Sequence, residues 1–395
     1  MKKVLYLQYM NPAYNPLLMH GAAILRRDGW KVFFLAIASG AARKNIRFEK
    51  ANEYQVLQLA YCGPGWRQKI HYLFYAVLAV GYSLFYRIDW IYASNPVSCP
   101  IALVMSFFPW FRILYHEHDT PPQGRGGSVF DAVINFSRNR LLLRCAIVVI
   151  PNLERIIKES VYLRIREKVF VVPNFPQPDE VDFALRPACG ERFGLYYHGD
   201  ISHKRIPLAL IEAMTKVPDD VTLTIVGFEF EAGYCEKIQL YASRLGVSRR
   251  IKIFPPGLRR DLFLKCLSCG TVGVSLVPLN DEDINFRFME GASQKTFEYM
   301  MCGLALLVPC LPNWRARFVE SGYGLACVPD DAQSIASAIN WFYSHPSETK
   351  AMGERGRERI RSEWNYGNAF SAVLNKLNLV TRGGSERGKG GHKKQ

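Results

Sequence analysis

Short hydrophobic runs alternate with amphipathic stretches along the first half of the chain. The runs cover residues 4–10, 31–37, 90–94, 111–119, 146–152 and 169–175. Stretches with helical spacing lie between them, at 17–28, 71–85, the residues after Pro96 and 129–144. Continuous apolar strands that alternate with helices are typical of a parallel sheet covered by helices on both faces. The pattern therefore predicts a doubly wound α/β domain.

The same alternation begins again after a proline-rich segment. Residues 173–193 contain four prolines and little periodicity, as a linker does. Hydrophobic runs follow at 193–201, 221–227, 251–256, 271–279 and 304–310, with helical patterns at 207–216, 234–245, 259–268, 294–301 and 332–379. We predict an N-terminal Rossmann-like domain at 1–174, a linker at 175–191, a C-terminal Rossmann-like domain at 192–362, a C-terminal helix at 363–380 and a disordered basic tail at 381–395.

Neither the N-terminus nor the longest apolar segment predicts a membrane helix. The first ten residues resemble a signal peptide, but the run is short and breaks at Asn11 and Pro12 without a small-residue cleavage site. Residues 72–86 are interrupted by Gly81 and Ser83 and fall short of the roughly 20 residues that span a bilayer. We therefore interpret the first run as a buried strand and the second as a core helix.

Cysteine usage indicates a reducing compartment, and hence a cytoplasmic protein. The ten cysteines are scattered, mostly within apolar stretches, where a thiol behaves as a small hydrophobe. Cys266 and Cys269 form a C-x-x-C pair, but no second Cys or His pair stands at zinc spacing. We expect no metal or redox site there.

The formal charge of +15 is unevenly distributed. Residues 381–395 contribute four of these charges, and residues 26–69 carry nine Lys or Arg against three Asp or Glu, interleaved with aromatic side chains. Such a surface suits anionic lipid headgroups, phosphorylated substrates or nucleic acid. A plainly solvated basic face is the alternative interpretation.

Two glutamates flank the beginning of the predicted helix at 294–301. Ligands of open parallel sheets bind beyond the carboxyl ends of the strands, and Glu290 stands in such a loop. Ser293 is placed to begin the helix, whose free N–H groups can bind an anion. Lys295 opposes the helix dipole unless a diphosphate binds there. Glu298 can accept hydrogen bonds from a ribose diol, although a solvated helix position is the alternative.

Lys204 and Arg205 follow another predicted strand and could neutralise a leaving diphosphate, a task that Mg²⁺ performs in metal-dependent enzymes. An ordinary surface pair is the alternative. The acidic run 281–283 could suggest a metal site, but its neighbours are polar loop residues. We favour solvation of these carboxylates.

Four polar residues end the strand at 111–119. Strand alternation puts His116 and His118 on one face with Glu117 opposite, so this run is a poor zinc site. We expect one imidazole, His118 first, to line the ligand site and bond a sugar hydroxyl, with Asp119 orienting it or capping the next segment. The loop from Asn11 to Asn15 follows the first strand and completes this side.

Several segments resemble the family-4 retaining glycosyltransferases, which have the GT-B fold. EGASQKTFEYMMCGLALLVP resembles their E-x7-E segment, with Glu290 and Glu298 at the acidic positions. YYHGDISHKRIPLALIEAM resembles the stretch of glycine and basic residues that opens the donor domain, and VFVVPNF resembles the V-x-P-N that ends the first domain, at Asn174. Residues 323–360 resemble the family's C-terminal stretch, including Met352–Gly353 and Gly356–Arg357. The loop after the first strand lacks the family's usual Gly-Gly.

The resemblance implies two doubly wound Rossmann-like domains facing a cleft, with a C-terminal helix returning to the first domain. It implies a donor site on the second domain, with the ribose at Glu298, the donor sugar or diphosphate at Glu290, and the diphosphate at Lys204, Arg205 and Lys295. We place Ser293 and Gly199 in the same donor site. The acceptor side would be the first domain, with Asn11, Asn15, His116 and Asp119. No cofactor and no metal are implied.

We therefore expect a retaining hexosyltransferase that uses a nucleotide-diphosphate sugar. Its acceptor would be a saccharide or a lipid-linked saccharide in surface polysaccharide or glycolipid synthesis, met at the inner face of an anionic membrane. Two alternatives are a GT-B epimerase or phosphorylase, and a non-enzymatic basic protein that binds membrane or nucleic acid. The acids and bases at strand ends argue against the non-enzymatic alternative, and we expect no nucleic-acid partner.

Overall fold

The computed structural model describes residues 1–12, 15–39, 53–121, 128–177, 180, 193–254, 267 and 270–389, except for the side chains of 16 and 382–389. These residues form two compact units, Met1–Pro173 with Tyr366–Gln395 as unit 1 and Asn174–Asn365 as unit 2. Cys266, Cys269, the predicted helix at 259–268 and most of the predicted linker lie outside or largely outside the described residues.

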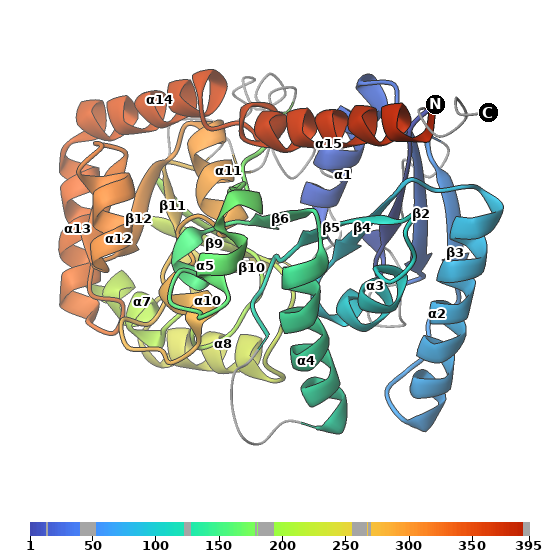
Figure 1. The fold of residues 1–395 in the computed structure, drawn as a ribbon. Coiled ribbons are helices and arrows are strands. Elements are labelled where there is room, and N and C mark those ends of the chain that lie inside the picture. Colours follow the sequence, from blue (N-terminus) through green and yellow to red (C-terminus); the bar gives the residue numbers. More distant parts are fainter. Residues whose placement is uncertain are drawn as a thin grey trace, which may run out of the picture. The chain divides into compact units, whose positions relative to one another are not determined.

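Unit 1 contains a sheet whose described strands all pair in parallel, in the order β3-β2-β1-β4-β5-β6-β7 (Figure 1). The strands are β1 Lys3–Leu7, β2 Lys31–Ile37, β3 Gln55–Leu59, β4 Trp90–Ser94, β5 Arg112–His116, β6 Ile147–Ile150 and β7 Val169–Val171. The central strands are buried over nearly their whole length, because helices cover both faces.

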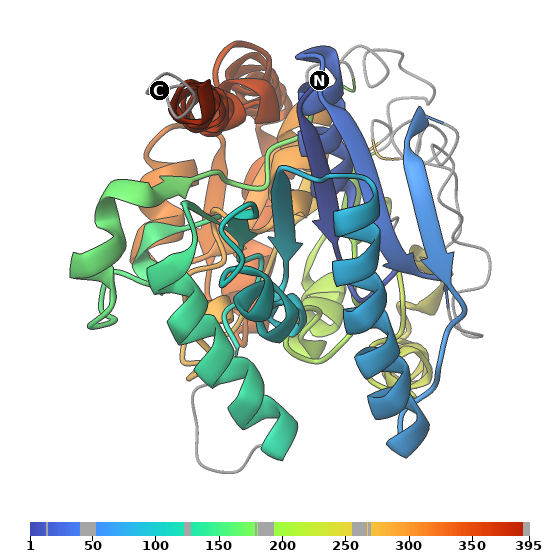
Figure 2. The same ribbon diagram turned by 45° about the vertical axis from the view of Figure 1, so that its right-hand side comes forward.

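The helices α2 Trp66–Phe85, α3 Cys99–Met105 and α4 Val129–Arg144 cover one face of this sheet (Figure 2). Their inward side chains pack with strand residues such as Leu5, Ile91 and Tyr115 in one hydrophobic core. The shorter elements are η4 Pro96–Ser98, η5 Leu153–Arg155, α5 Tyr162–Ile165 and η6 Arg166–Lys168.

The expectation that residues 72–86 form a core helix is wrong for the outer side of α2. Only Tyr75, Ala79 and Ser83 of this helix are fully buried. The three are four residues apart, so they form one stripe against the sheet. Other apolar residues of the helix lie partly against the core at the edges of this stripe, whereas Leu73, Phe74 and Val77 are exposed.

The C-terminal helix α15, Tyr366–Lys389, belongs to unit 1 and packs with α1, Pro16–Arg27, on the other side of the sheet. Trp90 Nε1 donates to Thr381 Oγ1 at 3.0 Å, which ties this helix to β4. The predicted return of the C-terminal helix to the first domain is confirmed. The helix continues past Thr381, where we expected a disordered tail to begin. In the described part of the chain, no helix is long and apolar enough to cross a membrane.

Unit 2 contains a second sheet of parallel strands, in the order β10-β9-β8-β11-β12-β13. The strands are β8 Gly194–His198, β9 Thr222–Val226, β10 Ile251–Phe254, β11 Val272–Val274, β12 Ala305–Pro309 and β13 Gly324–Cys327. The described helices are α7 Leu208–Ala213, η7 Met214–Lys216, α8 Tyr234–Arg244, η8 Ser248–Arg250, α10 Ile284–Arg287, α11 Gln294–Cys302, α12 Pro312–Trp314, the π-helix η9 Arg315–Val319, α13 Ala332–Ser344 and α14 Pro346–Ser362. The prediction of two doubly wound α/β domains is confirmed.

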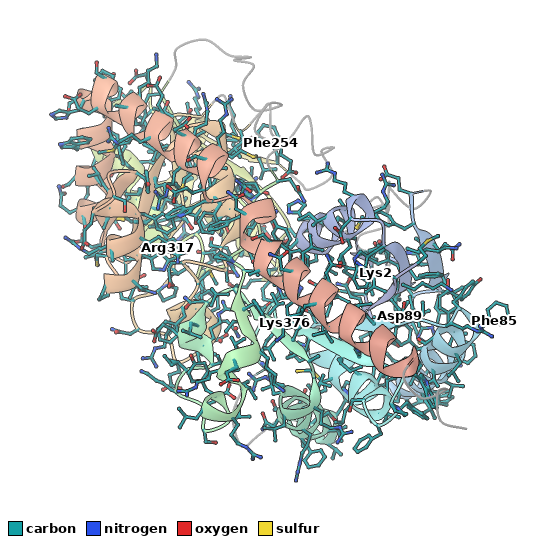
Figure 3. The ribbon with its side chains drawn as sticks, turned by 45° about the horizontal axis from the view of Figure 1, so that its top comes forward. Lys2, Phe85, Asp89, Phe254, Arg317 and Lys376 are labelled. Atoms are coloured by element: carbon teal, nitrogen blue, oxygen red, sulfur yellow. The ribbon has the colours of Figure 1, made fainter. Side chains whose placement is uncertain are left out.

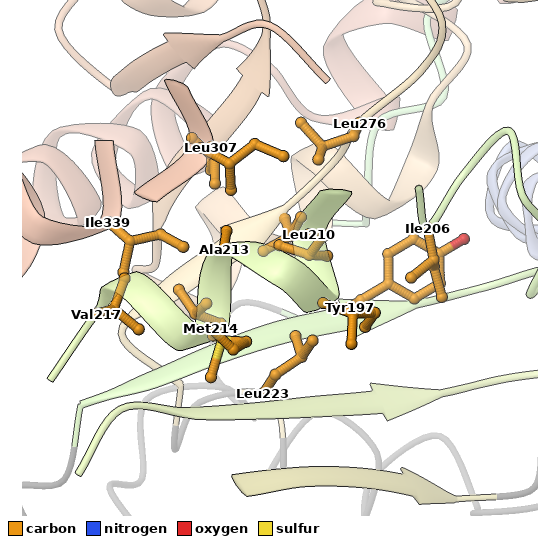
Figure 4. Close-up of a cluster of buried hydrophobic side chains, with 14 of the residues drawn as sticks. Tyr197, Ile206, Leu210, Ala213, Met214, Val217, Leu223, Leu276, Leu307 and Ile339 are labelled. Carbon is orange, nitrogen blue, oxygen red and sulfur yellow. The ribbon is translucent and has the colours of Figure 1, made fainter. Parts of the chain in front are cut away.

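A buried hydrophobic cluster joins the helices of unit 2 to its sheet (Figure 4). Leu210 and Met214 of the α7–η7 segment meet Leu223 of β9 and Ile339 of α13 in this cluster. The cluster packs the helices against the strands, and this packing holds the carboxyl ends of the strands and the loops beyond them in place.

Two glycines allow α14 to lie directly against the end of α11. Gly303 ends α11 in the left-handed region, at φ +78°, where glycine is favoured. A Cβ on Gly353 would stand 1.9 Å from the Gly303 carbonyl oxygen, so only glycine fits there. Arg357 of α14 donates to the Cys302 carbonyl at 2.7 Å and thereby satisfies the helix end. These contacts place the beginning of α11 firmly beside β8 and β11.

Candidate functional site

The turn after β8 forms one wall of the site in unit 2. Gly199 has φ +120°, a conformation that side chains with a Cβ rarely adopt. A Cβ on Gly227, at the end of β9, would lie 1.7 Å from the Gly199 carbonyl oxygen. Both glycines therefore let the backbone turn closely at the carboxyl edge of the sheet. Gly199 was predicted as a site residue, whereas Gly227 was not.

Lys295 lies against this turn from the first turn of α11. Its Nζ donates to the Tyr197 hydroxyl at 3.2 Å and stands 4.4 Å from the centre of the Tyr197 ring. A Cβ on Gly199 would be 3.8 Å from the same nitrogen. Burial lowers the pKa of Lys295 well below its usual value, the charge of Arg205 adds to the effect, and Asp200 opposes it. Burial thus disfavours the charged form of Lys295, and Asp200 compensates for this only in part.

Glu298 is held from two sides one turn further along α11. His198 Nε2 lies 3.0 Å from Glu298 Oε2, and Gln294 Nε2 donates to Glu298 Oε1 at 2.8 Å. Only 1% of the residue is exposed. Glu298 is therefore not the solvated helix residue that was the alternative interpretation, because its carboxylate is buried and oriented at the edge of β8.

Glu290 stands in a loop that Asn174 fixes. The Asn174 backbone N–H donates to the Gly291 carbonyl at 2.9 Å, and its side-chain amide donates to the Ala292 carbonyl at 2.6 Å. Asn313 Nδ2 donates to Glu290 Oε2 at 2.5 Å, and the residue is 5% exposed. The loop before α11 is therefore rigidly positioned, with its carboxylate buried.

Ser293 occupies the N-cap position of α11, but its hydroxyl makes no cap bond to the backbone. Instead it accepts from the Thr296 hydroxyl at 3.0 Å. The first N–H groups of a helix have no partner within the helix. The Ser293 carbonyl accepts the Thr296 N–H at 3.2 Å, whereas the Ser293 side chain caps none of these groups.

The two predicted cations after β8 differ in their surroundings. Lys204 Nζ forms a 2.7 Å ion pair with Asp281, whose side chain is 8% exposed. Arg205, by contrast, influences the titration of both Lys295 and Tyr197 and therefore lies toward them. Both cations stand about 5 Å from the centre of the Phe286 ring, at 5.0 and 5.2 Å.

In the acidic run 281–283, for which we expected solvation, Glu282 and Asp283 are exposed and only Asp281 is largely buried. Asp281 also accepts the backbone N–H of Asp283 at 3.0 Å, and Asp283 caps α10 through the N–H of Asn285. Among the described residues, no group of three His, Cys, Asp or Glu side chains could hold a metal ion. The run stabilises its own loop and positions Lys204.

The strand ends of unit 1 bring two histidines together. The rings of His116 and His118 are 3.8 Å apart between centres, while the Glu117 carboxylate points elsewhere, as strand alternation predicts. The Tyr92 hydroxyl lies 2.6 Å from His116 Nδ1. Burial lowers the pKa of His116 well below its usual value, and burial followed by the charge of Arg155 lowers that of His118 to about 3. Both imidazoles are therefore neutral near pH 7.

Two further polar side chains lie level with His116 at the same edge. Leu7 pairs with Ala93 and Ser94 pairs with His116, so Gln8, Ser94 and His116 form one row across β1, β4 and β5. Both polar atoms of the Gln8 side chain, Ser94 Oγ, His116 Nε2 and both His118 ring nitrogens are buried without a hydrogen-bond partner in the described part of the chain. Buried polar groups normally have partners.

Glu117 has a different environment on the opposite face. Arg138 binds its carboxylate with two nitrogens, at 2.5 and 2.7 Å, and also bonds both oxygens of Glu159 at 3.0 Å. Tyr115 and Thr120 donate to the same Glu117 carboxylate, each at 2.9 Å. This network satisfies itself within unit 1 and holds the loop after β5 in place.

The remaining predicted residues of unit 1 do not join the histidines. Asp119 is 76% exposed and lies 3.6 Å from Arg155, so Tyr92 and not Asp119 orients an imidazole. Asn11 is buried and bonds Ser39 at 2.7 Å. Asn15 stands at the N-cap of α1 without a side-chain cap bond. Ala13 and Tyr14, between them, lie outside the described residues.

The sequence interpretation missed several residues that complete these sites. They are Gln8, Tyr92, Ser94, Asn174 as a loop anchor, Tyr197, His198, Gly227 and Asn313. His198 and Gly227 stand at strand ends, so inspecting every predicted strand end would have found them. Asn313 and Tyr92 could not be found in this way, because only the folded chain brings them to Glu290 and His116.

Residues 266–375 match a family model described as glycosyl transferase-like. A search of curated protein sequences finds no match. Among solved structures, HepE from Anabaena in complex with UDP and glucose is 16% identical, with a TM-score of 0.71 over 96% of this chain and 100% of HepE. Sucrose-phosphate synthase from Thermosynechococcus elongatus is 15% identical, with a TM-score of 0.72 over 97% of this chain and 100% of that chain.

WaaG, a glycosyltransferase involved in lipopolysaccharide biosynthesis, is 13% identical, with a TM-score of 0.63 over 94% of this chain and 98% of that one. Likenesses at such low identity establish the fold, and the family match covers mainly unit 2. The chain thus has the GT-B fold, and residues 266–375 are similar to glycosyl transferase-like proteins.

Proposed function

We propose that the chain is a retaining glycosyltransferase that moves a hexose from a UDP-sugar to a saccharide or lipid-linked acceptor. The observation that carries the proposal is the buried, only partly compensated Lys295 beside the oriented carboxylate of Glu298 at the beginning of α11. A nucleoside diphosphate supplies an anion for the cation and a diol for the carboxylate. HepE, a protein with the same fold, has been crystallised with UDP-glucose, so UDP is the first nucleotide to test.

Glu298 would bind the ribose. His198 fixes one carboxylate oxygen, and the Gln294 amide bonds the other. A ribose diol can replace the Gln294 amide, because two hydroxyl groups offer the same donors at the same oxygen. The charge-assisted bonds that result are about twice as strong as neutral ones.

Lys295 and Arg205 would bind the diphosphate, with the N–H groups at the beginning of α11. Lys204 contributes less, because Asp281 already binds its ammonium group at 2.7 Å. Two cations and a helix N-terminus can stabilise the leaving diphosphate without a metal. The diphosphate then departs from the face that the acceptor attacks, so that no side chain acts as a covalent nucleophile and the anomeric configuration is retained.

Glu290 would lie at the donor sugar. Its loop is fixed by Asn174, and Asn313 orients its carboxylate. A buried carboxylate can accept hydrogen bonds from sugar hydroxyls and stabilise positive charge that develops on the ring in the transition state.

The row of neutral polar groups in unit 1 would bind hydroxyl groups of a sugar. His118, His116, Gln8 and Ser94 offer donors and acceptors without charge, which suits hydroxyls rather than phosphates. We assign His118 the closest approach to the reacting sugar, as expected from the sequence, and place the acceptor at this unit. The pathway we favour is surface polysaccharide or glycolipid synthesis on the cytoplasmic side of a membrane, without a nucleic-acid partner.

Calorimetric titration of UDP, GDP and ADP tests the donor site. Binding of a diphosphate should raise the pKa of Lys295, so at a pH between the pKa of the free and of the bound protein the complex should take up protons. This uptake is measured as a heat that depends on the ionisation enthalpy of the buffer. Lys295→Met should lose this uptake and bind at least about tenfold more weakly. Lys237→Met is the matched control, because Lys237 also lies over a tyrosine ring, 5.7 Å from the centre of Tyr234, but on the exposed side of α8.

Unchanged nucleotide affinity in folded Lys295→Met would show that the donor site lies elsewhere. Product analysis with UDP-glucose and a mixture of saccharide acceptors then separates the alternatives of the same fold. Transfer with retention supports the proposal, whereas an isomerised sugar nucleotide indicates an epimerase and a sugar phosphate formed with inorganic phosphate indicates a phosphorylase.

A further inference from the structure

The outward side of α2 is apolar instead of polar. Trp66, Ile70, Leu73, Phe74, Val77 and Phe85 are 56–80% exposed. They recur every three or four residues along much of the helix, opposite the stripe of Tyr75, Ala79 and Ser83 that faces the core. A helix on the surface of a water-soluble domain normally presents charged and polar residues on this side. Phe85 projects clearly from the ribbon in Figure 3.

The neighbouring helices extend this apolar surface. Phe107 and Trp110, just after α3, are 65% and 53% exposed, and Val129 and Phe136 of α4 are 84% and 60% exposed. The three helices lie next to one another on one side of the sheet (Figure 2). Aromatic contact of Tyr72 with Phe130, at 5.4 Å between ring centres, connects α2 with α4. We call the outward sides of α2, α3 with its following turn, and α4 the α2–α4 face.

The charges around the α2–α4 face are almost all positive. From Tyr54 to His116 the sequence contains a single acidic residue, Asp89, which accepts the backbone N–H of Lys3 at 2.8 Å. Asp131 of α4 is engaged in a capping box with Ser128. The cations stand beside the apolar rings: Arg67 lies 5.6 Å from the Trp66 ring, Arg140 lies 5.5 Å from Phe136, and Arg144 lies 4.0 Å from Phe107.

The beginning of α2 is also positively charged and lacks acidic residues. Arg67 and Lys69 stand in its first turn, where the helix dipole disfavours cations, and no acidic residue accompanies them. Such an arrangement costs stability in water but becomes favourable when an anionic surface lies against the helix.

We propose that the α2–α4 face binds the surface of an anionic lipid bilayer. Tryptophan and phenylalanine side chains enter the boundary between headgroups and acyl chains, while arginine and lysine extend to the lipid phosphates. Each cation near such a surface adds attraction, and the scarcity of acidic side chains limits repulsion. The inward stripe of α2 is committed to the core of unit 1, so the helix lies along the membrane surface.

A second copy of the chain fits this face less well. A symmetric dimer would bring the same patch of each copy together. The cations of one copy would then meet those of the other, and the only acidic residue in the three helices, Asp131, is engaged in its capping box. A lipid headgroup region provides the missing anions.

This inference deepens the proposed function. That the acceptor is linked to a lipid rests on the proposed function itself. Residues 26–69, the basic region that first suggested membrane contact, lie mainly before α2, and only their end overlaps it. The structure thus assigns the contact chiefly to an apolar and cationic surface formed by α2, α3 and α4.

Vesicle co-sedimentation tests the proposal, with phosphatidylcholine vesicles and with vesicles that contain phosphatidylglycerol in addition. The parent protein should bind the anionic vesicles and bind phosphatidylcholine much more weakly. The triple variant Leu73→Gln, Phe74→Gln, Val77→Gln should bind anionic vesicles at least about tenfold more weakly, because it removes apolar area from the interface. Arg67→Gln with Lys69→Gln should reduce binding most at low salt.

The matched control replaces three exposed apolar residues outside the face. Leu163, Phe230 and Leu240 are 73%, 73% and 56% exposed, and changing them to Gln should leave vesicle binding unchanged. Circular dichroism and UDP titration should show that the α2 variant is folded and binds nucleotide like the parent, which separates this inference from the donor site.

Three results would overturn the proposal: no preference of the parent for anionic vesicles, equal binding by the α2 variant, or equal loss in the control. A dimer in sedimentation velocity that the α2 variant abolishes, without vesicle binding by the parent, would identify the face as an interface between two copies. Vesicle binding by a parent protein that fails to bind any nucleotide would refute the donor site and leave this inference standing.

Discussion

The carboxyl edges of the two sheets hold different kinds of polar side chain, charged in unit 2 and neutral in unit 1. In unit 2 the edge holds buried charged groups, and Lys295 has no carboxylate bonded to its ammonium among the described residues. In unit 1 the edge holds neutral groups, with His116 and His118 kept uncharged by burial. A cation that folding leaves only partly compensated indicates an anionic ligand, whereas neutral groups without partners indicate a ligand rich in hydroxyls.

Unit 1 also contains a buried charge that stabilises the fold, the carboxylate of Glu117. Glu117 is bonded by Arg138, Tyr115 and Thr120, so its charge is fully engaged within the unit. Glu117 and His118 are adjacent in sequence, yet one stabilises the loop and the other faces a polar row without partners. Burial of a polar side chain therefore does not by itself indicate a ligand site. A buried polar side chain without hydrogen-bond partners does.

The largest expected effect comes from breaking the internal network of unit 1. Arg138→Met leaves Glu117 and Glu159 without their shared cation, and removing one partner of a buried ion pair costs about 3–5 kcal/mol. Chemical denaturation monitored by circular dichroism should show this loss in the free energy of unfolding. Arg140→Met, on the exposed side of the same helix, should cost little. A small effect of Arg138→Met would mean that Glu117 is not held as the structure shows.

A smaller loss of free energy, in binding rather than folding, should follow from Glu298→Gln in unit 2. The change keeps the size of the side chain and removes the charge, so a ribose would lose a charge-assisted bond worth about 1.5–3 kcal/mol. UDP affinity should fall by about tenfold to a hundredfold in calorimetric titration, with the fold intact. Glu290→Gln should lower turnover more than UDP affinity, because Glu290 would lie at the sugar.

A folded Glu298→Gln protein with the UDP affinity of the parent would remove the proposed donor site. The exposed Glu354 of α14 provides the control, because its replacement with Gln should change neither affinity nor turnover.

Sequence alone could predict both sheets and the charged residues at the edge of the sheet in unit 2. The runs at strand ends placed Glu290, Lys295 and Glu298 together, because an E-x7-E spacing at a helix beginning is local in the chain. The row of Gln8, Ser94 and His116 could not be predicted, since it depends on the register of three strands far apart in sequence. The apolar surface of α2 was mistaken for core because hydrophobicity shows where burial is favourable, and not what covers the helix.

The histidines of unit 1 should make its stability depend on pH. An unfolded imidazole binds a proton near pH 6.5, whereas burial keeps folded His118 neutral down to about pH 3. As pH falls below 6.5, the unfolded state gains a proton that the folded state does not, and the free energy of unfolding drops by about 1.4 kcal/mol per pH unit for this residue.

His116, whose pKa is also lowered, acts in the same direction. Denaturation between pH 7 and 5 should therefore show a smaller slope in His118→Asn than in the parent, whereas replacing His203, which is 62% exposed, should leave the slope unchanged. Equal slopes in the His118→Asn variant and the parent would show that this ring is accessible to protons. The proposed role of His118 as a neutral hydrogen-bonding group would then be refuted.

The smallest expected effect is that of chelation, for which we expect no change in turnover. The carboxylate of Asp281, which contacts Lys204, is already bonded to this cation at 2.7 Å. Lys295, Arg205 and the N-terminus of α11 would carry the charge of the leaving diphosphate in place of a metal. Transfer measured with excess EDTA should equal transfer with Mg²⁺ or Mn²⁺ added. Loss of activity in EDTA, with recovery on adding either ion, would contradict this prediction. It would mean that the cations of unit 2 bind the nucleotide but do not stabilise the leaving diphosphate. The charged edge of unit 2 and the neutral edge of unit 1 would then differ only in the ligands that they bind.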